Sequence, residues 1–416
     1  MLFNVVNLGC KVNRVESDAC AAALVGAGWS ESPLEAADLV VVNTCTVTGE
    51  ADKKTRKAVR HALAINPFAP VLVTGCAAAI SPDLYRSLDQ RVEIVGKASL
   101  NERVLELASS LGASREGALP LAGAVTALPV GGGFRTRVGV KAQDGCDNAC
   151  TYCIVHVARG RSTSRPLELV ASECGALARA GVREIVLTGI NLGRYRDRSA
   201  DGVCDLVDLL QAVLAATREA DGPGDFPARV RIGSIEPRDV DARLVELLAS
   251  SGGRIARHLH LPLQSGNSKV LREMARPYSA EMFEELVCGL RASVPEIALS
   301  TDIIAGFPGE TEAEFEDTLA LARRARFMKI HAFPYSRREG TPAAARDDQV
   351  PAEIKTERAS RLRALSDELA AADLEARRGT TELALVEGGG RATLESYHEA
   401  DVGPDAELGA LVPVTV

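Results

Sequence analysis

The chain has 416 residues, of which 46% are hydrophobic, and its formal net charge at neutral pH is −8. This length is sufficient for two or three domains with full cores. The negative charge argues against a uniformly basic nucleic-acid-binding protein, although a local basic patch can still bind nucleic acid. Without a charged leader or an apolar run of membrane-spanning length, we expect a cytoplasmic protein whose ten cysteines are metal ligands or core thiols.

Three short apolar segments in the N-terminal quarter each end at a cysteine, namely Cys10, Cys45 and Cys76. A helix-like stretch follows each of them, which predicts three successive βα units. If the strands are parallel, all three thiols emerge at one edge of a sheet and could hold an iron–sulfur cluster. The alternative is three separate buried thiols, a common environment for cysteine.

The alternation of apolar segments predicts an α/β chain with four parts. Residues 1–111 form a small Rossmann-like parallel-sheet domain, and residues 112–133, rich in Gly, Ala, Pro and Leu, form a linker. Residues 134–378 form the second domain, which ends in a helix from Ala352 to Arg378. Residues 379–416 contain short strand-like runs joined by turns, which predicts a small β module, with an incomplete module as the alternative.

A second group of cysteines, Cys146, Cys150 and Cys153, lies within a single loop that follows a predicted strand. Three thiolates at this spacing can hold three corners of a four-iron cluster and leave one iron open to a small molecule. The alternative is a zinc site, but structural zinc takes four ligands, usually from two Cys-x-x-Cys pairs.

Six strand-like segments alternate with helical ones in residues 134–378, which predicts an open six-stranded parallel barrel with its helices outside. The strand-like segments are 137–143, 183–189, 229–236, 257–264, 296–306 and 328–336. Barrel enzymes build their sites at strand ends, so we expect cofactor contacts from the residues placed there: Gly189, Asn191, Ser234, Glu236 and Gln264. His258 and His260 alternate on one strand and face the same way, and we favour hydrogen-bonded core histidines over a lining role.

Basic residues cluster around the cysteine loop, where Phe134 to Pro166 contains six basic residues against two acidic ones. The tail after Arg378 has one arginine against seven acidic residues. We expect nucleic-acid phosphate contacts in the basic stretch, at Arg159, Arg161 and Arg165; the alternative is a solvated loop with paired arginines. The remaining cysteines resemble core thiols in helices, and we assign them no function: Cys20, Cys174, Cys204 and Cys288.

The loop Cys146-Asp-Asn-Ala-Cys150-Thr-Tyr152-Cys153 resembles the Cys-x-x-x-Cys-x-aromatic-Cys signature of radical S-adenosylmethionine enzymes. The resemblance implies that its three cysteines bind a 4Fe-4S cluster whose open iron binds S-adenosylmethionine. It also implies that Tyr152 lies against the adenine of that cofactor. Cleavage of the cofactor then gives a 5'-deoxyadenosyl radical.

The two cysteine sets, the barrel and the β tail together resemble the radical methylthiotransferases. The resemblance implies a second 4Fe-4S cluster on Cys10, Cys45 and Cys76, a TRAM-like tail, and an electron donor such as flavodoxin or ferredoxin. Local strings near Cys10 and near Pro334 resemble the branch that adds a methylthio group to C2 of N6-threonylcarbamoyladenosine beside the tRNA anticodon.

The alternatives within this family are isopentenyladenosine in tRNA and an aspartate of a ribosomal protein. An iron–sulfur RNA-binding protein without catalytic activity is a further alternative. It would require neither an open iron nor a barrel-sized cavity.

Overall fold

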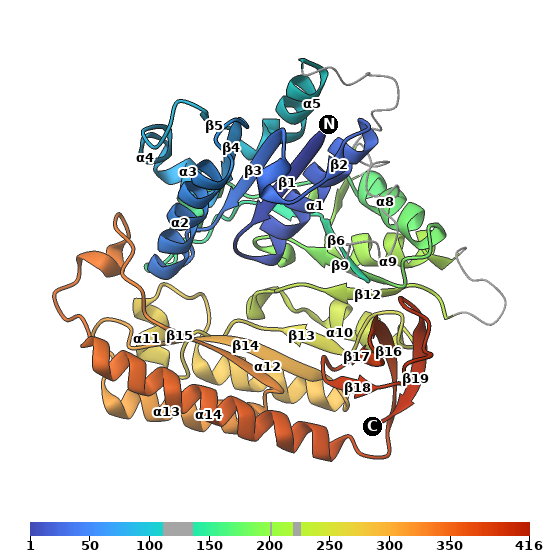
Figure 1. Ribbon diagram of the computed structural model, residues 1–416. Helices are drawn as coiled ribbons and strands as arrows, with labels where there is room; N and C mark the ends of the chain where they lie inside the picture. The colour runs from blue at the N-terminus through green and yellow to red at the C-terminus, as the bar shows by residue number, and fades with distance from the viewer. Residues whose placement is uncertain (111–135, 200–201, 219–225) are drawn as a thin grey trace. The chain divides into compact units, whose positions relative to one another are not determined.

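The computed structural model describes residues 1–110, 136–199, 202–218 and 226–416 (Figure 1). The predicted linker at 112–133 lies outside the described residues. The chain divides into two compact units. The first unit contains the N-terminal domain together with Gly145–Asp147 and Ile154–Arg161, and the second contains the barrel strands and the C-terminal tail.

The first unit is built on a five-stranded parallel sheet in the order β2-β1-β3-β4-β5. This is one of the two common orders of doubly wound α/β sheets, so the predicted parallel-sheet domain is confirmed. The chain reverses its direction of winding between β1 and β3, and ligands of such folds bind outside this switch point. The strands are β1 (Leu2–Asn7), β2 (Ser30–Glu31), β3 (Leu39–Thr44), β4 (Val71–Gly75) and β5 (Val92–Ile94).

Alternate residues of β3 face opposite layers of core. Leu39 and Val41 are buried with residues of two helices on one face, whereas Val40 and Val42 are buried against the other face. The first layer contains α1 (Lys11–Gly26) and α5 (Leu100–Ser110). The remaining helices of the unit are α2 (Gly49–Ile65), α3 (Cys76–Ile80), α4 (Pro82–Arg86) and α7 (Val155–Arg159).

The second unit contains the six predicted strands, all parallel and in chain order. Two three-stranded sheets, β6-β9-β12 and β13-β14-β15, are connected through parallel bridges from Val230 to Ile255 and from Ser234 to His260. The predicted open barrel is confirmed. Its strands are β6 (Arg137–Lys141), β9 (Glu184–Thr188), β12 (Arg229–Ile232), β13 (His258–His260), β14 (Ala298–Ala305) and β15 (Lys329–Pro334).

Helices separate the barrel strands, and the trailing helix ends at Ala376 rather than at the predicted Arg378. No helix among the described residues is long and apolar enough to cross a membrane. The helices are α8 (Leu167–Arg179), α9 (Leu206–Ala216), α10 (Ala242–Ser250), α11 (Ser268–Glu273), α12 (Ala280–Ser293), α13 (Glu312–Ala325) and α14 (Ala352–Ala376). Two short antiparallel pairs complete the connections: β7 (Gln143–Asp144) with β8 (Thr163–Ser164), and β10 (Asp197–Ser199) with β11 (Gly202–Cys204).

The C-terminal tail forms a four-stranded antiparallel sheet in the order β18-β17-β16-β19, as its turn-separated strand pattern predicted. Its small core is made of Ala384, Val386, Ala392 and Leu394. The strands are β16 (Thr381–Gly388), β17 (Arg391–Leu394), β18 (Glu399–Asp401) and β19 (Leu411–Thr415).

A buried ionic cluster attaches this tail to the barrel. Glu184 of β9 accepts hydrogen bonds from the Nε atoms of Arg229 at 2.9 Å and Arg231 at 2.7 Å, and the three side chains are at most 1% exposed. Arg229 also donates to the carbonyl oxygen of Leu383 at 2.6 Å, and Arg231 to those of Glu395 at 2.7 Å and Leu394 at 3.1 Å. The two arginines therefore connect two elements distant in sequence.

The ionic cluster controls the ionisation of Glu184. Burial alone raises the pKa of the Glu184 carboxyl, but the charges of Arg231 and Arg229 outweigh burial and lower it from 4.5 to about 2. A carboxyl group with a lowered pKa in the folded state stabilises that state above its unfolded pKa. This contribution is lost as the pH falls from about 4.5 toward 2.

Replacing Glu184 with Gln should destabilise the second unit at neutral pH by about 3–5 kcal/mol, because two arginines are left buried without their carboxylate. Hydrogen–deuterium exchange of β16 and β17 measures the effect at the tail. The matched control is Glu284→Gln, which removes an exposed pair with Arg324 and should cost less than about 0.5 kcal/mol. Equal exchange in the two variants would contradict a structural role for the cluster.

Candidate functional site

The three dispersed cysteines occupy equivalent places in the first unit. Cys10 is the N-cap of α1 after β1, Cys45 follows β3, and Cys76 is the first residue of α3 after β4. Strands β1, β3 and β4 are adjacent and parallel, so the three residues lie at one carboxyl edge. Cys10 and Cys45 flank the switch point of the sheet. The predicted arrangement of three βα units is confirmed.

Cys45 lies in a buried and crowded environment. Burial raises the pKa of the Cys45 thiol, the backbone of Val47 lowers it, and the charges of Cys10 and Cys76 raise it again. Gly9 adopts a φ of +111°, and a Cβ there would lie 2.8 Å from the Cys45 sulfur. Glycine is therefore required where the chain turns toward this sulfur.

Two cations reach the sulfur of Cys76. Lys97 Nζ lies 3.4 Å from it, and Nε of Arg159 lies 3.3 Å from it. The guanidinium of Arg159 also donates to Glu16 at 3.0 and 3.1 Å and to Asn13 Oδ1 at 2.6 Å, and its side chain is 0% exposed. The RNA contact expected of Arg159 does not fit this position, because its side chain is buried among the thiol set. Lys97 and Arg159 therefore place positive charge beside the Cys76 sulfur, where it stabilises a thiolate.

The compact cysteine loop contributes Cys146 to the first unit and Cys150 and Cys153 to the second. In the first unit, the N–H of Cys146 donates to the carbonyl oxygen of Gly160 at 3.1 Å. Gly145 adopts a φ of +72°, and a Cβ there would collide with the carbonyl oxygen of Arg161. The backbone of this loop is therefore held by the turn at residues 160–161.

In the second unit, the sulfur of Cys150 accepts a hydrogen bond from Nη1 of Arg276 at 3.3 Å. Arg276 is buried and also binds the carboxylate of Glu236. Burial raises the pKa of Glu236, while the charge of Arg276 opposes that rise. Tyr152 packs beside this loop against an apolar cluster that includes Met274.

The residues expected at strand ends fall into two groups. Gly189 and Asn191 surround the side chain of Gln143: the Asn191 N–H donates to Gln143 Oε1 at 2.8 Å, and a Cβ at Gly189 would lie 2.8 Å from the same oxygen. Ser234 bridges to β13, whereas Gln264 bridges to β14 with a φ of 68°. Gln143 and Arg276 were not predicted, because an isolated glutamine in a strand or an isolated arginine in a loop carries no local signal of a site.

The remaining expectations have mixed outcomes. Arg161 is exposed, whereas Arg165 donates to Glu173 at 2.6 Å and to the Lys141 carbonyl oxygen at 2.9 Å. Cys20 and Cys174 are buried core thiols as expected. The core-thiol interpretation is wrong for the other two: Cys204 ends strand β11 and is only partly buried, and Cys288 is exposed on α12. Exposure of one face of a helix is not visible from its Ala and Leu content.

Both cysteine sets suit an iron–sulfur cluster better than a single ion. Soft thiolates with nearby hydrogen-bond donors and cations are typical of cluster sites, in which such contacts set the charge balance. Among the described residues, the group of ligating atoms that all lie within 4.8 Å of one another is His260, Asp302 and His331. The set of Cys10, Cys45 and Cys76 within the first unit is less compact than this group, as expected for ligands spread over the corners of a cubane.

Comparisons with known proteins identify the family. Residues 140–322 match the radical SAM superfamily, and residues 3–96 match the family described as "Uncharacterized protein family UPF0004". The chain is 39% identical over 373 residues to a threonylcarbamoyladenosine tRNA methylthiotransferase, MtaB, of Bacillus subtilis, covering 87% of this chain and 80% of that protein. It is 34% identical to a tRNA-2-methylthio-N(6)-dimethylallyladenosine synthase of the same organism, covering 100% of this chain and 83% of that protein.

A solved structure supports the fold independently. The radical S-adenosylmethionine methyltransferase TsrM from Kitasatospora setae, with cobalamin and a 4Fe-4S cluster bound, superimposes with a TM-score of 0.57 at 18% identity, covering 82% of this chain and 77% of that one. The match to the radical SAM superfamily identifies the chain as an enzyme that uses a 4Fe-4S cluster and S-adenosylmethionine. With relatives of this identity and coverage, the chain belongs to the radical S-adenosylmethionine methylthiotransferase family.

Proposed function

We propose that the protein is a tRNA methylthiotransferase that adds a methylthio group to C2 of N6-threonylcarbamoyladenosine beside the anticodon. The observation that carries the proposal is the gathering of Cys10, Cys45 and Cys76 at one sheet edge, in a chain that also contains the radical loop. The substrate is assigned from the Bacillus subtilis MtaB, a threonylcarbamoyladenosine tRNA methylthiotransferase that is 39% identical to this chain. The related synthase acting on dimethylallyladenosine is the alternative that the first experiment must separate.

Each cysteine set holds one 4Fe-4S cluster in this proposal. Cys146, Cys150 and Cys153 are the ligands of the radical cluster, and Cys10, Cys45 and Cys76 are those of the auxiliary cluster. When bound, these clusters and S-adenosylmethionine supply the radical, the sulfur and the methyl group. The chain itself supplies position and electrostatics.

The charged residues around the sulfurs have defined tasks. Arg276 donates to Cys150 and is oriented by Glu236, while Arg159 donates to Cys76 and is oriented by Glu16. A guanidinium at a sulfur stabilises extra negative charge on a thiolate or a reduced cluster. Binding of S-adenosylmethionine is assigned to Tyr152 and to the strand-end residues Gly189, Asn191, Ser234, Glu236 and Gln264.

Recognition of tRNA is assigned to the basic stretch beside the cysteine loop. Arg161 is exposed and can reach a phosphate, and Arg165 is partly exposed at 34%. The target base leaves the anticodon loop to enter the barrel, as recognition of single-stranded RNA generally requires. The setting is the cytoplasm, with flavodoxin or ferredoxin as electron donor.

The function is tested by incubating the reconstituted enzyme with S-adenosylmethionine, a reductant and tRNA that contains threonylcarbamoyladenosine. Mass spectrometry of the digested nucleosides should show the 2-methylthio derivative. Parallel incubations use tRNA that contains dimethylallyladenosine and intact ribosomes. A methylthio product only with the dimethylallyladenosine tRNA, or only with ribosomes, would overturn the substrate assignment. The absence of product in all three incubations would overturn the activity.

Substitutions in the two cysteine sets should remove different steps of the reaction. Cys146→Ala should abolish formation of 5'-deoxyadenosine, because the radical cluster loses a ligand. Cys45→Ala should retain 5'-deoxyadenosine formation but lose the methylthio product. Chromatography of both products measures the split, and Cys288→Ala, which replaces an exposed thiol, is the matched control. A Cys45→Ala enzyme that still thiolates tRNA would contradict the division of tasks.

Arg276→Gln should lower the reduction potential of the radical cluster by an amount on the order of tens of millivolts, since a buried cation next to Cys150 stabilises the reduced state. A redox titration followed by electron paramagnetic resonance measures the shift without reference to turnover. Arg272→Gln, at an exposed position on α11, is the matched control and should leave the potential unchanged. Identical potentials in the two variants would remove Arg276 from this role.

A further inference from the structure

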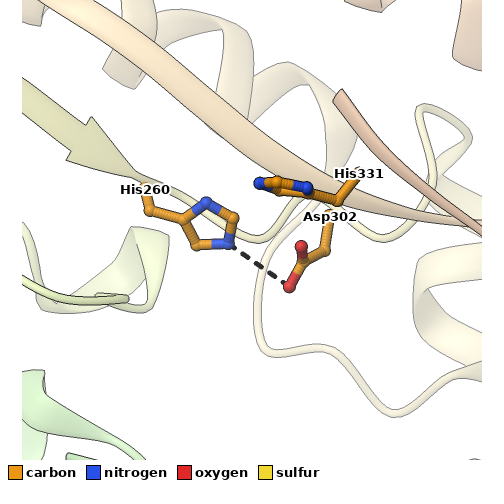
Figure 2. A group of neighbouring side chains, drawn as sticks. All are labelled: His260, Asp302 and His331. Carbon is orange, nitrogen blue, oxygen red and sulfur yellow. Dashed lines mark ion pairs between the residues drawn. The ribbon is translucent and has the colours of Figure 1, made fainter. Parts of the chain in front are cut away.

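Three side chains from adjacent strands of the barrel meet on one face of the sheet. His260 ends β13, Asp302 lies in β14 and His331 in β15, and Figure 2 shows the three side chains directed toward one another. Asp302 is the direct register partner of His331, and His260 is the partner of Ser300, two positions before Asp302. Parallel pairing thus places residues 71 positions apart in one small group.

The distances suit ligands of one ion. Nε2 of His260 lies 3.3 Å from Oδ2 of Asp302, and the ligating atoms of all three residues lie within 4.8 Å of one another. Two ligands of a tetrahedral ion, each about 2.1 Å from it, are about 3.4 Å apart. The pair of His260 and Asp302 already has this spacing, and the ligating atom of His331 lies within 4.8 Å of both.

Ser300 holds one of these ligands in place. Its hydroxyl lies 2.9 Å from Nδ1 of His260 and 2.9 Å from Nε2 of His258. A hydroxyl donates one proton, so it can accept from Nδ1 of His260 while donating to His258. In that arrangement Nε2 of His260 offers its lone pair toward Asp302, and the second ring nitrogen has the partner that metal-binding histidines generally have.

The donor set and its exposure indicate the kind of ion. Two imidazoles and one carboxylate suit zinc and neighbouring divalent transition metals, whereas magnesium and calcium prefer oxygen ligands. Asp302 is partly exposed and His331 exposed, so an ion here keeps coordination positions for water or a substrate group. Structural zinc sites, in contrast, are closed by four protein ligands.

We propose that His260, Asp302 and His331 form a site for one divalent transition metal ion, of the zinc class, separate from both cysteine sets. The ion lies between Nε2 of His260 and the Asp302 carboxylate, where it accepts the lone pair of the nitrogen and a carboxylate oxygen. Its open positions face the same side of the sheet as the three ligands and are suited to an oxygen of a bound substrate.

The test uses the full-length protein with its cysteine clusters assembled, so that the cysteines are already occupied. After dialysis against a mild chelator, the protein is titrated anaerobically with Co²⁺ and with Zn²⁺ in separate experiments. We expect one equivalent of Co²⁺, seen as a weak visible difference spectrum over the cluster absorbance and without the sulfur charge-transfer bands that cysteine ligation adds. We expect Zn²⁺ to displace it.

The variants decide whether these residues are the ligands. Ser300→Ala should weaken binding by about 10–100-fold, and Asp302→Asn and His331→Ala by at least as much. His61→Ala, at an exposed histidine of α2, should bind as the unchanged protein does. Retained cluster absorbance in each variant shows that it is folded.

Two results would overturn the proposal. The first is the lack of stoichiometric Co²⁺ or Zn²⁺ binding, which leaves His260 and Asp302 as an ion pair only. The second is binding of equal strength in the unchanged protein and in Asp302→Asn and His331→Ala, which places the ion elsewhere on the surface. Neither result bears on the methylthiotransferase activity, which is measured separately.

Discussion

Parallel strand pairing fixes which residues of distant segments become neighbours, and the chemistry of both units depends on this constraint. In the first unit it gathers Cys10, Cys45 and Cys76 from three successive βα units. In the second unit the register of β13, β14 and β15 aligns His260, Asp302 and His331. Neither group is a local motif, and each exists only because hydrogen-bonded strands fix which residues are neighbours.

The two units use the same electrostatic device at their cysteines. In each, a buried arginine donates to a sulfur and is itself held by a glutamate: Arg159 between Cys76 and Glu16, and Arg276 between Cys150 and Glu236. Burying an unpaired guanidinium costs free energy. The glutamate offsets this cost by pairing with the guanidinium, and it also fixes the direction of the arginine side chain. The arginine then presents positive charge to the sulfur without losing its own counter-ion.

Local sequence features predicted the fold well. Alternating apolar segments gave all six barrel strands, and the position of each early cysteine after a strand gave the sheet edge. The radical loop was recognisable because its cysteines are close in sequence. These features depend on spacing of a few residues, which a sequence displays directly.

Partners that are distant in sequence could not be predicted. The contact of Arg276 with Cys150 spans 126 positions, and the burial of Arg159 depends on Glu16 of another helix. Charge counting therefore placed Arg159 on an RNA surface, although the fold turns it inward. The alternation of His258 and His260 correctly implied a shared face, but the register that brings Asp302 and His331 to His260 is set by strand pairing.

The attachment of the C-terminal sheet has a consequence for how such enzymes can diversify. Arg229 and Arg231 satisfy part of their hydrogen-bonding capacity on carbonyl groups of β16 and of the turn after β17. A chimera that exchanges this sheet for that of a relative must reproduce those carbonyl positions, or it leaves two charged groups unsatisfied in the interior. The sheet therefore cannot be exchanged independently of its barrel.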